Sequence, residues 1–591
     1  MPVRTRPAES RPADLVLVDG DVLTVDAGFS TAQALAVRDG VITAVGSTAA
    51  VLGHAGPATR VVDLRGRTVL PGINDSHLHG HAWGLNRPPL ALDLNFPAVR
   101  SIADIVAAVA AAARAAAPGE WIVGRGWDVG YLAECRDGSR TLPDRADLDA
   151  AAPDNPVCLT DFSDHMAWVN SAALRAAGIG PATQPPPGGT IDADPAGHPT
   201  GILREAAQRA VHAHIPRADE HRRRAAITGA ISALHALGTT SYTEPGLGPG
   251  GEGIMAGAMG TGALRSYLDL ARGGELHARV SLLLLPSPMG GGLPDVRAGL
   301  AELAALPLDD IDPRRLAVLG VKLFADGVPP NRTAWMHDAY RGGGHGALCV
   351  HGAAPALQAA ELTAMIAAVH AAGHQIGVHV TGDRAIDTVA DAFAAAQRAH
   401  PRSDARHYLI HGDFATGRSL ALLAEHGYGV NMNPAIKWTI SDLMDEVVGT
   451  ERSGRMWPVR SALTAGVRLC ASSDAPITEP DWRRGVASML LRESKATGRT
   501  SGPQERVGLP EAVRAYTSAP AVQDFAEHWK GTLESGKVAD LCVLGGRLAD
   551  TSPHDLPDLP VDLTLFDGRA VHGTLGPRRP PRHARRGPAV G

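Results

Sequence analysis

The sequence predicts an α/β protein: a (β/α)8 barrel, or TIM barrel, with a small β-sandwich built from both chain ends and an insertion after the first barrel strand. Three observations predict this architecture. Short apolar segments in the middle of the chain alternate with helical segments, which indicates a parallel sheet that can close into a barrel. Strand-rich segments flank this region on both sides. The gap between the first two barrel strands is much longer than a crossover connection needs.

The expected barrel strands are short runs rich in β-branched and large apolar residues. They cover residues 67–73, 239–243, 279–285, 318–324, 375–380, 407–410, 428–432 and 467–471. Helical segments such as 356–372 and 384–399 separate them. We assign residues 69–530 to the barrel and its insertion.

Both ends of the chain contain several short segments that are expected to be strands. Near the N-terminus, residues 15–18, 22–25, 34–37 and 41–45 read as strands, and near the C-terminus residues 539–544 and 563–566 do. Asp-Gly pairs at 19–20, 39–40 and 567–568 are typical of tight hairpin turns. We therefore predict one β-sandwich from residues 1–68 and 531–576.

The insertion is expected near residues 85–220. It contains an Ala-rich helix at 102–117, a strand at 121–123 and a Pro- and Gly-rich loop at 184–201. Because long loops on the catalytic face of a barrel shape substrate binding, we expect the insertion to cover the active site. The Pro- and Arg-rich stretch 577–591 is expected to be a disordered tail.

Composition excludes several classes of protein. The chain has 591 residues, 44% hydrophobic and 20% charged, with a net charge of -6, which does not favour nucleic acid or an anionic membrane as partner. Residues 1–14 lack the apolar segment of a secretory signal, and no apolar run could span a bilayer, so a cytoplasmic location is expected. The five cysteines form no Cys-x-x-Cys pair, which argues against a disulfide framework or a structural zinc cluster.

Residues that can bind a metal follow several expected barrel strands. His77 and His79 come directly after the first strand, and residues two apart on an extended chain point the same way, so both imidazoles can bind one metal. Lys322, His379, His411 and Asp474 lie at or near other strand ends. Barrel enzymes carry their catalytic groups at this end of the barrel. Taken alone, the His-x-His pair could also be a chance or core pair.

Longer motifs give these residues a context. They are PGINDSHLHG, HMAWVNSAAL from His165, PTGILRE from Pro199, GVKLFADG, HVTGDRA, SSDAP and GTLESGKVADLCVL from Gly531. With these motifs the sequence resembles the amidohydrolase superfamily along almost its whole length. Within that superfamily it is most similar to the branch of YtcJ-like proteins and N-substituted formamide deformylases.

The resemblance implies a ligand set. His77, His79 and Asp474 would bind the more buried metal, His379 and His411 a second one, and a carboxylated Lys322 would bridge the two. Imidazole and carboxylate ligands suit zinc, so about one or two zinc ions per chain are expected, together with carbon dioxide as the Lys322 carbamate. Two alternatives stay open: a buried Lys322 paired with Asp326, and His379 and His411 as core histidines.

The sequence departs from the branch at two places where substrate would bind. Relatives usually read Glu-His-Ala where this chain has Ile410-His411-Gly412, and Asp-Gly where Ser163-Asp164 precedes His165. His165, Trp168 and Arg332 are the candidate substrate-binding residues, although a structural role is as well supported for each. These departures leave the identity of the substrate open.

The resulting expectation is a hydrolase that cleaves an amide-type C–N bond of a small molecule. A metal lowers the pKa of bound water to roughly 7, and Asp474 can move the water's proton to the leaving amine. A homodimer is a further expectation. The alternatives are a lyase or isomerase that uses the same metal centre, and a non-catalytic binding protein on a decayed barrel.

Overall fold

A computed structural model describes residues 11–161, 166–186 and 189–576. The chain divides into two compact units. The first comprises Met1–His79, Ile231–Gly251 and Tyr267–Gly591, and the second comprises Gly80–Ala230 and Glu252–Ser266. In the described residues, no helix combines the length and the apolar composition that a membrane crossing requires.

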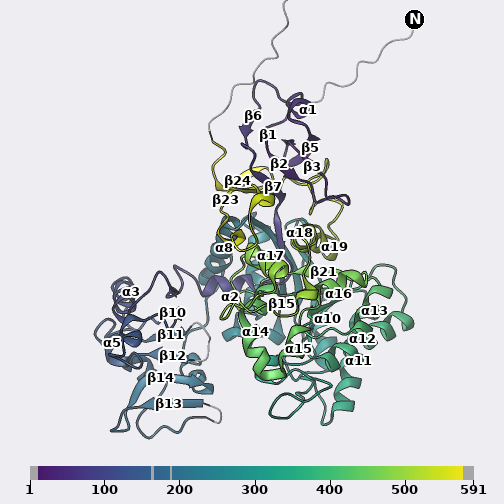
Figure 1. Ribbon diagram of the computed structural model, residues 1–591. Coiled ribbons are helices and arrows are strands. Elements are labelled where there is room, and N and C mark those ends of the chain that lie inside the picture. The colour runs from purple at the N-terminus through teal and green to yellow at the C-terminus, as the bar shows by residue number, and fades with distance from the viewer. Residues whose placement is uncertain (1–10, 162–165, 187–188, 577–591) are drawn as a thin grey trace, which may run out of the picture. The chain divides into compact units, whose positions relative to one another are not determined.

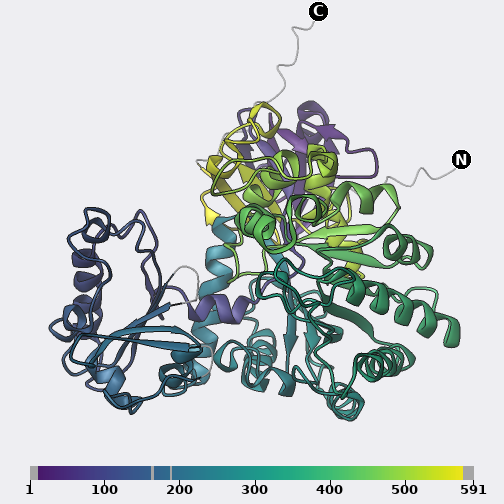
Figure 2. The same ribbon diagram turned by 60° about the horizontal axis from the view of Figure 1, so that its bottom comes forward.

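An eight-stranded sheet forms the centre of the first unit (Figure 2). Its strands, in spatial order, are β21 (Arg468–Ala471), β20 (Gly429–Met432), β19 (Tyr408–His411), β18 (Gln375–Val380), β17 (Leu316–Phe324), β16 (Arg279–Leu284), β15 (Thr239–Leu247) and β8 (Ile73–Asp75). Every neighbouring pair is parallel. The backbone N–H of Ser76 lies 3.5 Å from the carbonyl of Ala471, so the two end strands approach each other and the barrel is nearly closed. The predicted (β/α)8 barrel is confirmed.

Helices connect successive barrel strands. They are α8 (Glu220–Ala236), α9 (Thr261–Arg272), α10 (Leu293–Ala304), α11 (Pro355–Ala371), α12 (Asp383–Ala399), α13 (Gly417–Glu425), α14 (Pro434–Val448), α15 (Thr450–Gly454) and α16 (Val459–Thr464). After the last strand come α17 (Trp482–Leu491), α18 (Leu509–Ala515) and α19 (Ser518–Gln523). Strands and helices alternate because each parallel step needs a crossover connection.

The first predicted barrel strand, residues 67–73, is divided between two sheets. Its first part is β7 (Thr68–Pro71), which pairs with strands of the sandwich, and its end is β8 in the barrel. Gly72 lies between them, and a Cβ there would be 2.1 Å from the side-chain oxygen of Thr240. Both halves are fully buried strands, and the Pro71-Gly72 pair is the local feature that marks the break between them.

The sandwich combines both ends of the chain, which Figure 1 shows in purple and yellow. One sheet contains β5 (Val41–Gly46), β4 (Ala34–Arg38), β1 (Leu15–Val18) and β6 (Arg60–Asp63). The other contains β24 (Arg569–Gly573), β23 (Val561–Phe566), β22 (Leu541–Leu544), β7, β2 (Asp21–Leu23) and β3 (Thr31–Ala32). Leu17 and Leu35 from the first sheet share one core with Val69, Leu541 and Leu565 from the second. The predicted sandwich is confirmed.

Two of the three Asp-Gly pairs form the hairpins that they predict. Asp39-Gly40 joins β4 to β5 and Asp567-Gly568 joins β23 to β24, and all four residues have positive φ. For Asp19-Gly20 the hairpin prediction is wrong. It joins β1 to β2, which belong to different sheets, because the chain crosses the sandwich there. A Cβ on Gly20 would lie 2.4 Å from a methyl carbon of Leu64.

The second unit has its own sheet and core. Its strands are β13 (Gly189–Ala193), β14 (Pro199–Glu205), β12 (Met166–Val169), β11 (Val157–Asp161), β10 (Ile122–Trp127) and β9 (Leu92–Asp93), in spatial order. Its helices are α2 (Gly80–Leu85), α3 (Ile102–Ala115), α4 (Ala133–Arg136), α5 (Arg145–Asp149), α6 (Ser171–Ala176) and α7 (Arg209–His212). The interpretation of residues 184–201 as a loop is wrong, since β13 and β14 pair antiparallel there.

A buried histidine pair lies between α11 and the start of β19. His370 Nδ1 lies 2.7 Å from His407 Nε2, His407 Nδ1 accepts from the backbone N–H of Ile376 at 3.1 Å, and His370 Nε2 lies 2.7 Å from the carbonyl of His400. These contacts require that His407 donates through Nε2 and His370 through its own Nε2. Both remaining nitrogens already accept a hydrogen bond. A further proton on either ring would therefore face a donor.

This arrangement predicts loss of stability in mild acid. Burial, followed by the neighbouring His370 and Arg402, holds the pKa of His407 well below its usual value. In the unfolded chain His407 takes up a proton near pH 6.5, whereas in the folded chain it stays unprotonated at that pH. The free energy of unfolding should therefore fall as pH drops below about 6.5. Histidine C2 hydrogen–deuterium exchange, read by mass spectrometry, should place the His407 midpoint well below that of an ordinary histidine. An ordinary midpoint for His407 would contradict the prediction.

Candidate metal centre

The loops that follow β8 and β21 run side by side at the C-terminal end of the barrel. The backbone N–H of Asp474 donates to the carbonyl of His77 at 2.9 Å, and that of His79 donates to the carbonyl of Ala475, also at 2.9 Å. Strand 8 lies next to strand 1 when a barrel closes, which brings residues nearly 400 positions apart into one place. Asp474, three residues after the end of β21, has a positive φ of 57°.

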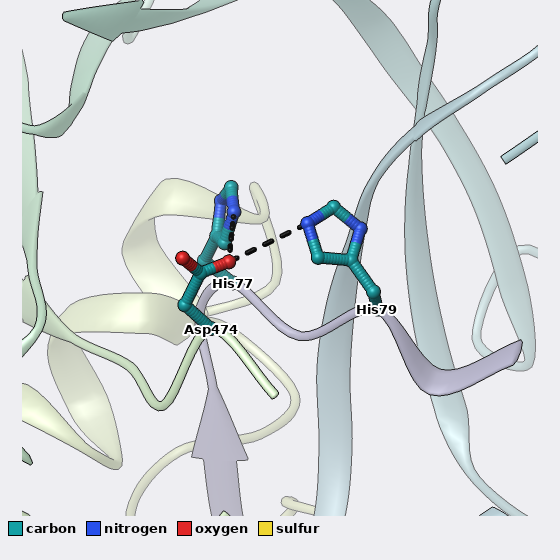
Figure 3. Close-up of side chains that lie close together, drawn as sticks. All are labelled: His77, His79 and Asp474. Atoms are coloured by element: carbon teal, nitrogen blue, oxygen red, sulfur yellow. Dashed lines mark ion pairs between the residues drawn. The ribbon is translucent and has the colours of Figure 1, made fainter. Parts of the chain in front are cut away.

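His77, His79 and Asp474 form a compact buried cluster (Figure 3). His77 Nε2 lies 3.1 Å and His79 Nε2 lies 3.4 Å from the same oxygen, Asp474 Oδ1. One candidate ligand atom from each residue falls within 4.8 Å of the others. Two imidazole nitrogens and a carboxylate, all turned toward one point, are a donor set that suits zinc or a similar divalent ion. The residues present therefore fit a metal.

The charges in this cluster depend on one another. Burial alone would raise the pKa of Asp474, but its interactions with His77, followed by those with His79 and His411, outweigh burial and hold that pKa well below the usual value. Burial, followed by the charge of Lys322, lowers the pKa of His77 well below its usual value. An ionised carboxylate beside a neutral imidazole is the protonation state that a metal site needs.

His411 and His379 extend the row of histidines along the barrel. The ring centre of His411 lies 5.2 Å from that of His77 and 4.5 Å from that of His379. His411 ends β19 with a φ of 75°, and its Nδ1 lies 2.7 Å from Asn433 Oδ1. Neither residue belongs to the compact cluster found among the described residues. The structure thus brings His77, His79 and Asp474 together and places His379 and His411 beside them.

Lys322 lies on β17 with a fully buried side chain. Burial lowers the pKa of its amine to about 7. Its Nζ lies 4.9 Å from the ring centre of Phe324, and in the part of the chain that the structure describes it has no hydrogen bond or ion pair. The carboxylate of Asp326 instead accepts from the backbone N–H groups of Trp335, Thr381 and Gly382. The alternative of a Lys322–Asp326 ion pair is therefore wrong.

The three candidate substrate-binding residues differ in their surroundings. His165 lies outside the described residues. Trp168 is fully buried in the core of the second unit, where its indole N–H donates to the carbonyl of Asp144 at 3.0 Å, which favours the structural role for this residue. Arg332 is exposed, has a φ of 56°, and its guanidinium lies beside Gly342.

Three polar residues around the centre were missed by sequence reasoning. Asp75 accepts the backbone N–H groups of His77 and Ser473, Asn433 contacts His411, and Glu244 Oε1 lies 3.5 Å from His79 Nδ1. A signal was present, because each lies at or near the end of a barrel strand: β8, β20 and β15. None of them belongs to a His-x-His type of pattern, so the sequence does not distinguish them from ordinary turn residues.

The fold and the buried His-His-Asp cluster define the class of protein: a barrel hydrolase that depends on a metal. Comparison with known proteins gives the family. The protein-family model described as "Amidohydrolase family" matches residues 60–572, and the chain belongs to this family. An N-substituted formamide deformylase from Arthrobacter pascens is 29% identical over 94% of this chain and 97% of its own.

Two further proteins also match this chain over nearly its whole length. The YtcJ protein of Bacillus subtilis (strain 168) is 28% identical over 91% of this chain and 96% of its own. The solved structure of an uncharacterized metal-dependent hydrolase from Pyrococcus furiosus is 26% identical, with a TM-score of 0.68, and covers 91% of this chain and 99% of that one. The resemblance inferred from the motifs is confirmed.

Proposed function

We propose that this protein hydrolyses an amide-type C–N bond in a small molecule: an N-substituted formamide, an N-acyl amine or a cyclic amide. The observation that carries the proposal is the convergence of two imidazole nitrogens on one oxygen of Asp474. His77, His79 and Asp474 would hold one divalent cation, His379 and His411 would hold a second, and a carboxylated Lys322 would be shared by both. Zinc is the metal that this donor set favours.

When bound, such a cation lowers the pKa of water to roughly 7 and polarises a carbonyl oxygen. The residues of the chain supply the proton transfers. Asp474 is ionised and has two oxygens, so one oxygen can act as a ligand while the other accepts the proton of the attacking water. The same carboxyl group then protonates the amine nitrogen as the C–N bond breaks. Burial lowers the pKa of His77, His379 and His411, which leaves these imidazoles neutral with lone pairs free for ligation. Burial acts the same way on His79, but its contacts with Asp474 and Glu244 outweigh burial and raise the pKa of His79, so a cation held there would take the place of its proton.

The substrate class rests on the relative from Arthrobacter pascens, which is named for the deformylation of N-substituted formamides and matches almost the full length of this chain. Most of the second compact unit, Gly80–Ala230, coincides with the insertion predicted near residues 85–220. We propose that this insertion contributes to substrate recognition. The domain limits of 1–68 and 531–576 for the sandwich and 69–530 for the barrel, the homodimer and the cytoplasmic location stay predictions.

A substrate panel in water enriched in heavy oxygen tests the proposal. Metal-loaded protein is incubated with N-substituted formamides, N-acyl amines and cyclic amides, and the products are identified by mass spectrometry. Hydrolysis puts solvent oxygen into the acyl product. Turnover without solvent oxygen would favour the lyase or isomerase alternative, and metal binding without turnover of any compound would favour a binding protein.

Carboxylation of Lys322 is a separate prediction. A bare ammonium would repel a cation, whereas a carbamate supplies two anionic oxygens that can bridge two metals. Burial leaves part of the amine uncharged near pH 7, which is the form that reacts with carbon dioxide. Carbon-13 NMR of protein equilibrated with labelled bicarbonate should show a carbamate signal. Lys322→Met is the matched control and should lack the signal, and a metal-loaded protein without the signal would contradict the prediction.

A further inference from the structure

A chain of buried oxygen atoms leads away from His79 on the side opposite to Asp474. His79 Nδ1 lies 3.5 Å from Glu244 Oε1, while its Nε2 faces Asp474. Tyr267 donates its hydroxyl to Glu244 Oε2 at 2.8 Å, and the hydroxyl of Tyr242 lies 2.9 Å from that of Tyr267. All three residues are at most 1% exposed, although a carboxylate is rarely buried so deeply without a reason.

The directions of the hydrogen bonds follow from the chemistry of the groups. Burial, followed by the negative charge of Glu244, raises the pKa of Tyr267 well above its usual value, so this hydroxyl keeps its proton and donates it. Tyr242 must then donate to the oxygen of Tyr267. An ionised carboxylate has no proton to give, so across the 3.5 Å that separates them it is His79 Nδ1 that would point a proton at Glu244. With Nδ1 turned to Glu244, Nε2, the atom that faces Asp474, is the nitrogen that would bind a metal.

We propose that Glu244 is a positioning residue for the metal centre: its carboxylate, held by Tyr267 and Tyr242, fixes the tautomer and the ring orientation of His79. The inference rests on the proposed metal-dependent function. A carboxylate behind a metal-binding histidine fixes the tautomer, and such partners typically contribute about ten- to a hundred-fold to metal affinity. Glu244 and Tyr242 both come from β15. One strand therefore supplies both the carboxylate and the last hydroxyl of the hydrogen-bonded series that supports it.

The test is the affinity of the full-length protein for cobalt, measured after removal of metal by a chelator. Glu244→Gln keeps the size of the side chain and removes its charge, and should weaken cobalt binding by about ten- to a hundred-fold. Tyr267→Phe removes only one hydroxyl and should cause a smaller loss, with Tyr242→Phe smaller again. The visible absorption of bound cobalt should change in Glu244→Gln, since the orientation of one ligand changes.

Two control variants separate positioning from general stability. Glu505→Gln alters another buried carboxylate, which accepts from the N–H and hydroxyl of Ser461, and Tyr428→Phe alters another buried tyrosine, which donates to Gln397. Both should bind cobalt like the parent protein. Cobalt affinity of Glu244→Gln within about twofold of the parent would overturn the inference. A parent protein that binds no cobalt would instead overturn the proposed function. If Glu244→Gln does not fold, an unchanged affinity in Tyr267→Phe overturns the inference.

Discussion

Turnover of the Asp474→Asn variant is expected to fall by at least about a hundred-fold, because general acid–base groups contribute roughly a hundred- to ten-thousand-fold. Asp474 is the acidic member of the cluster, and both His77 and His79 direct Nε2 at its Oδ1. Asparagine keeps the shape of the side chain, but its amide nitrogen cannot accept a proton. The low pKa of the native carboxyl means that Asp474 is ionised at neutral pH and ready to act as a base.

The measurement is turnover and metal content of Asp474→Asn on the same sample. Asp481→Asn is a matched control, since Asp481 follows in the same stretch of chain and accepts from the backbone N–H of Arg483 as the N-cap of α17. That variant should keep its turnover. If Asp474→Asn retains its metal and loses less than about tenfold in turnover, the proton passes through another group.

Replacing His77 with alanine should abolish both metal binding and turnover, and His79→Ala should do the same. Each variant removes one of the two imidazoles that converge on Asp474 Oδ1. A residue that only orients a ligand is worth about ten- to a hundred-fold in metal affinity, so loss of a ligand should exceed the upper end of that range. The backbone hydrogen bonds of His77 and His79 to the loop after β21 do not involve the imidazoles, which favours an intact fold.

Elemental analysis and circular dichroism of the purified variants check this expectation. His337→Ala is the matched control, because His337 is exposed and its ring contacts Asp387. It should keep its metal. A folded His77→Ala or His79→Ala protein with full metal content and near-native turnover would show that the ligand assignment is wrong.

Much of the fold follows from local patterns in the sequence. Seven of the expected barrel strands coincide with observed strands to within a few residues, because alternation of apolar strands and helices is a local signal. The first strand is the exception. Residues 67–73 read Arg-Thr-Val-Leu-Pro-Gly-Ile, and the interpretation of this segment as one strand overlooked the Pro71-Gly72 pair, which is a local signal for a break. The close approach of Thr240, far away in the sequence, is the reason that position 72 has no room for a Cβ.

The Asp-Gly pairs also show that local sequence predicts a turn but not which strands pair. The dipeptide favours a tight turn wherever it occurs, and at Asp39-Gly40 and Asp567-Gly568 the turn closes a hairpin. At Asp19-Gly20 the following strand pairs with β3 and β7 instead of β1. A turn residue determines the local backbone, but the partner of the next strand depends on which sheet can bury its side chains.

By itself the sequence determined the barrel, the sandwich built from both ends, and the candidate ligands, since each depends on residue type and on position relative to a strand end. Only the tertiary structure decided which candidates meet. His77, His79 and Asp474 converge because strand 8 closes against strand 1, and Asp326 is engaged by backbone N–H groups that belong to distant loops. Glu244 acquires its place behind His79 in the same way. Distances between residues far apart in the chain are set by packing, and packing has no local signature in a sequence.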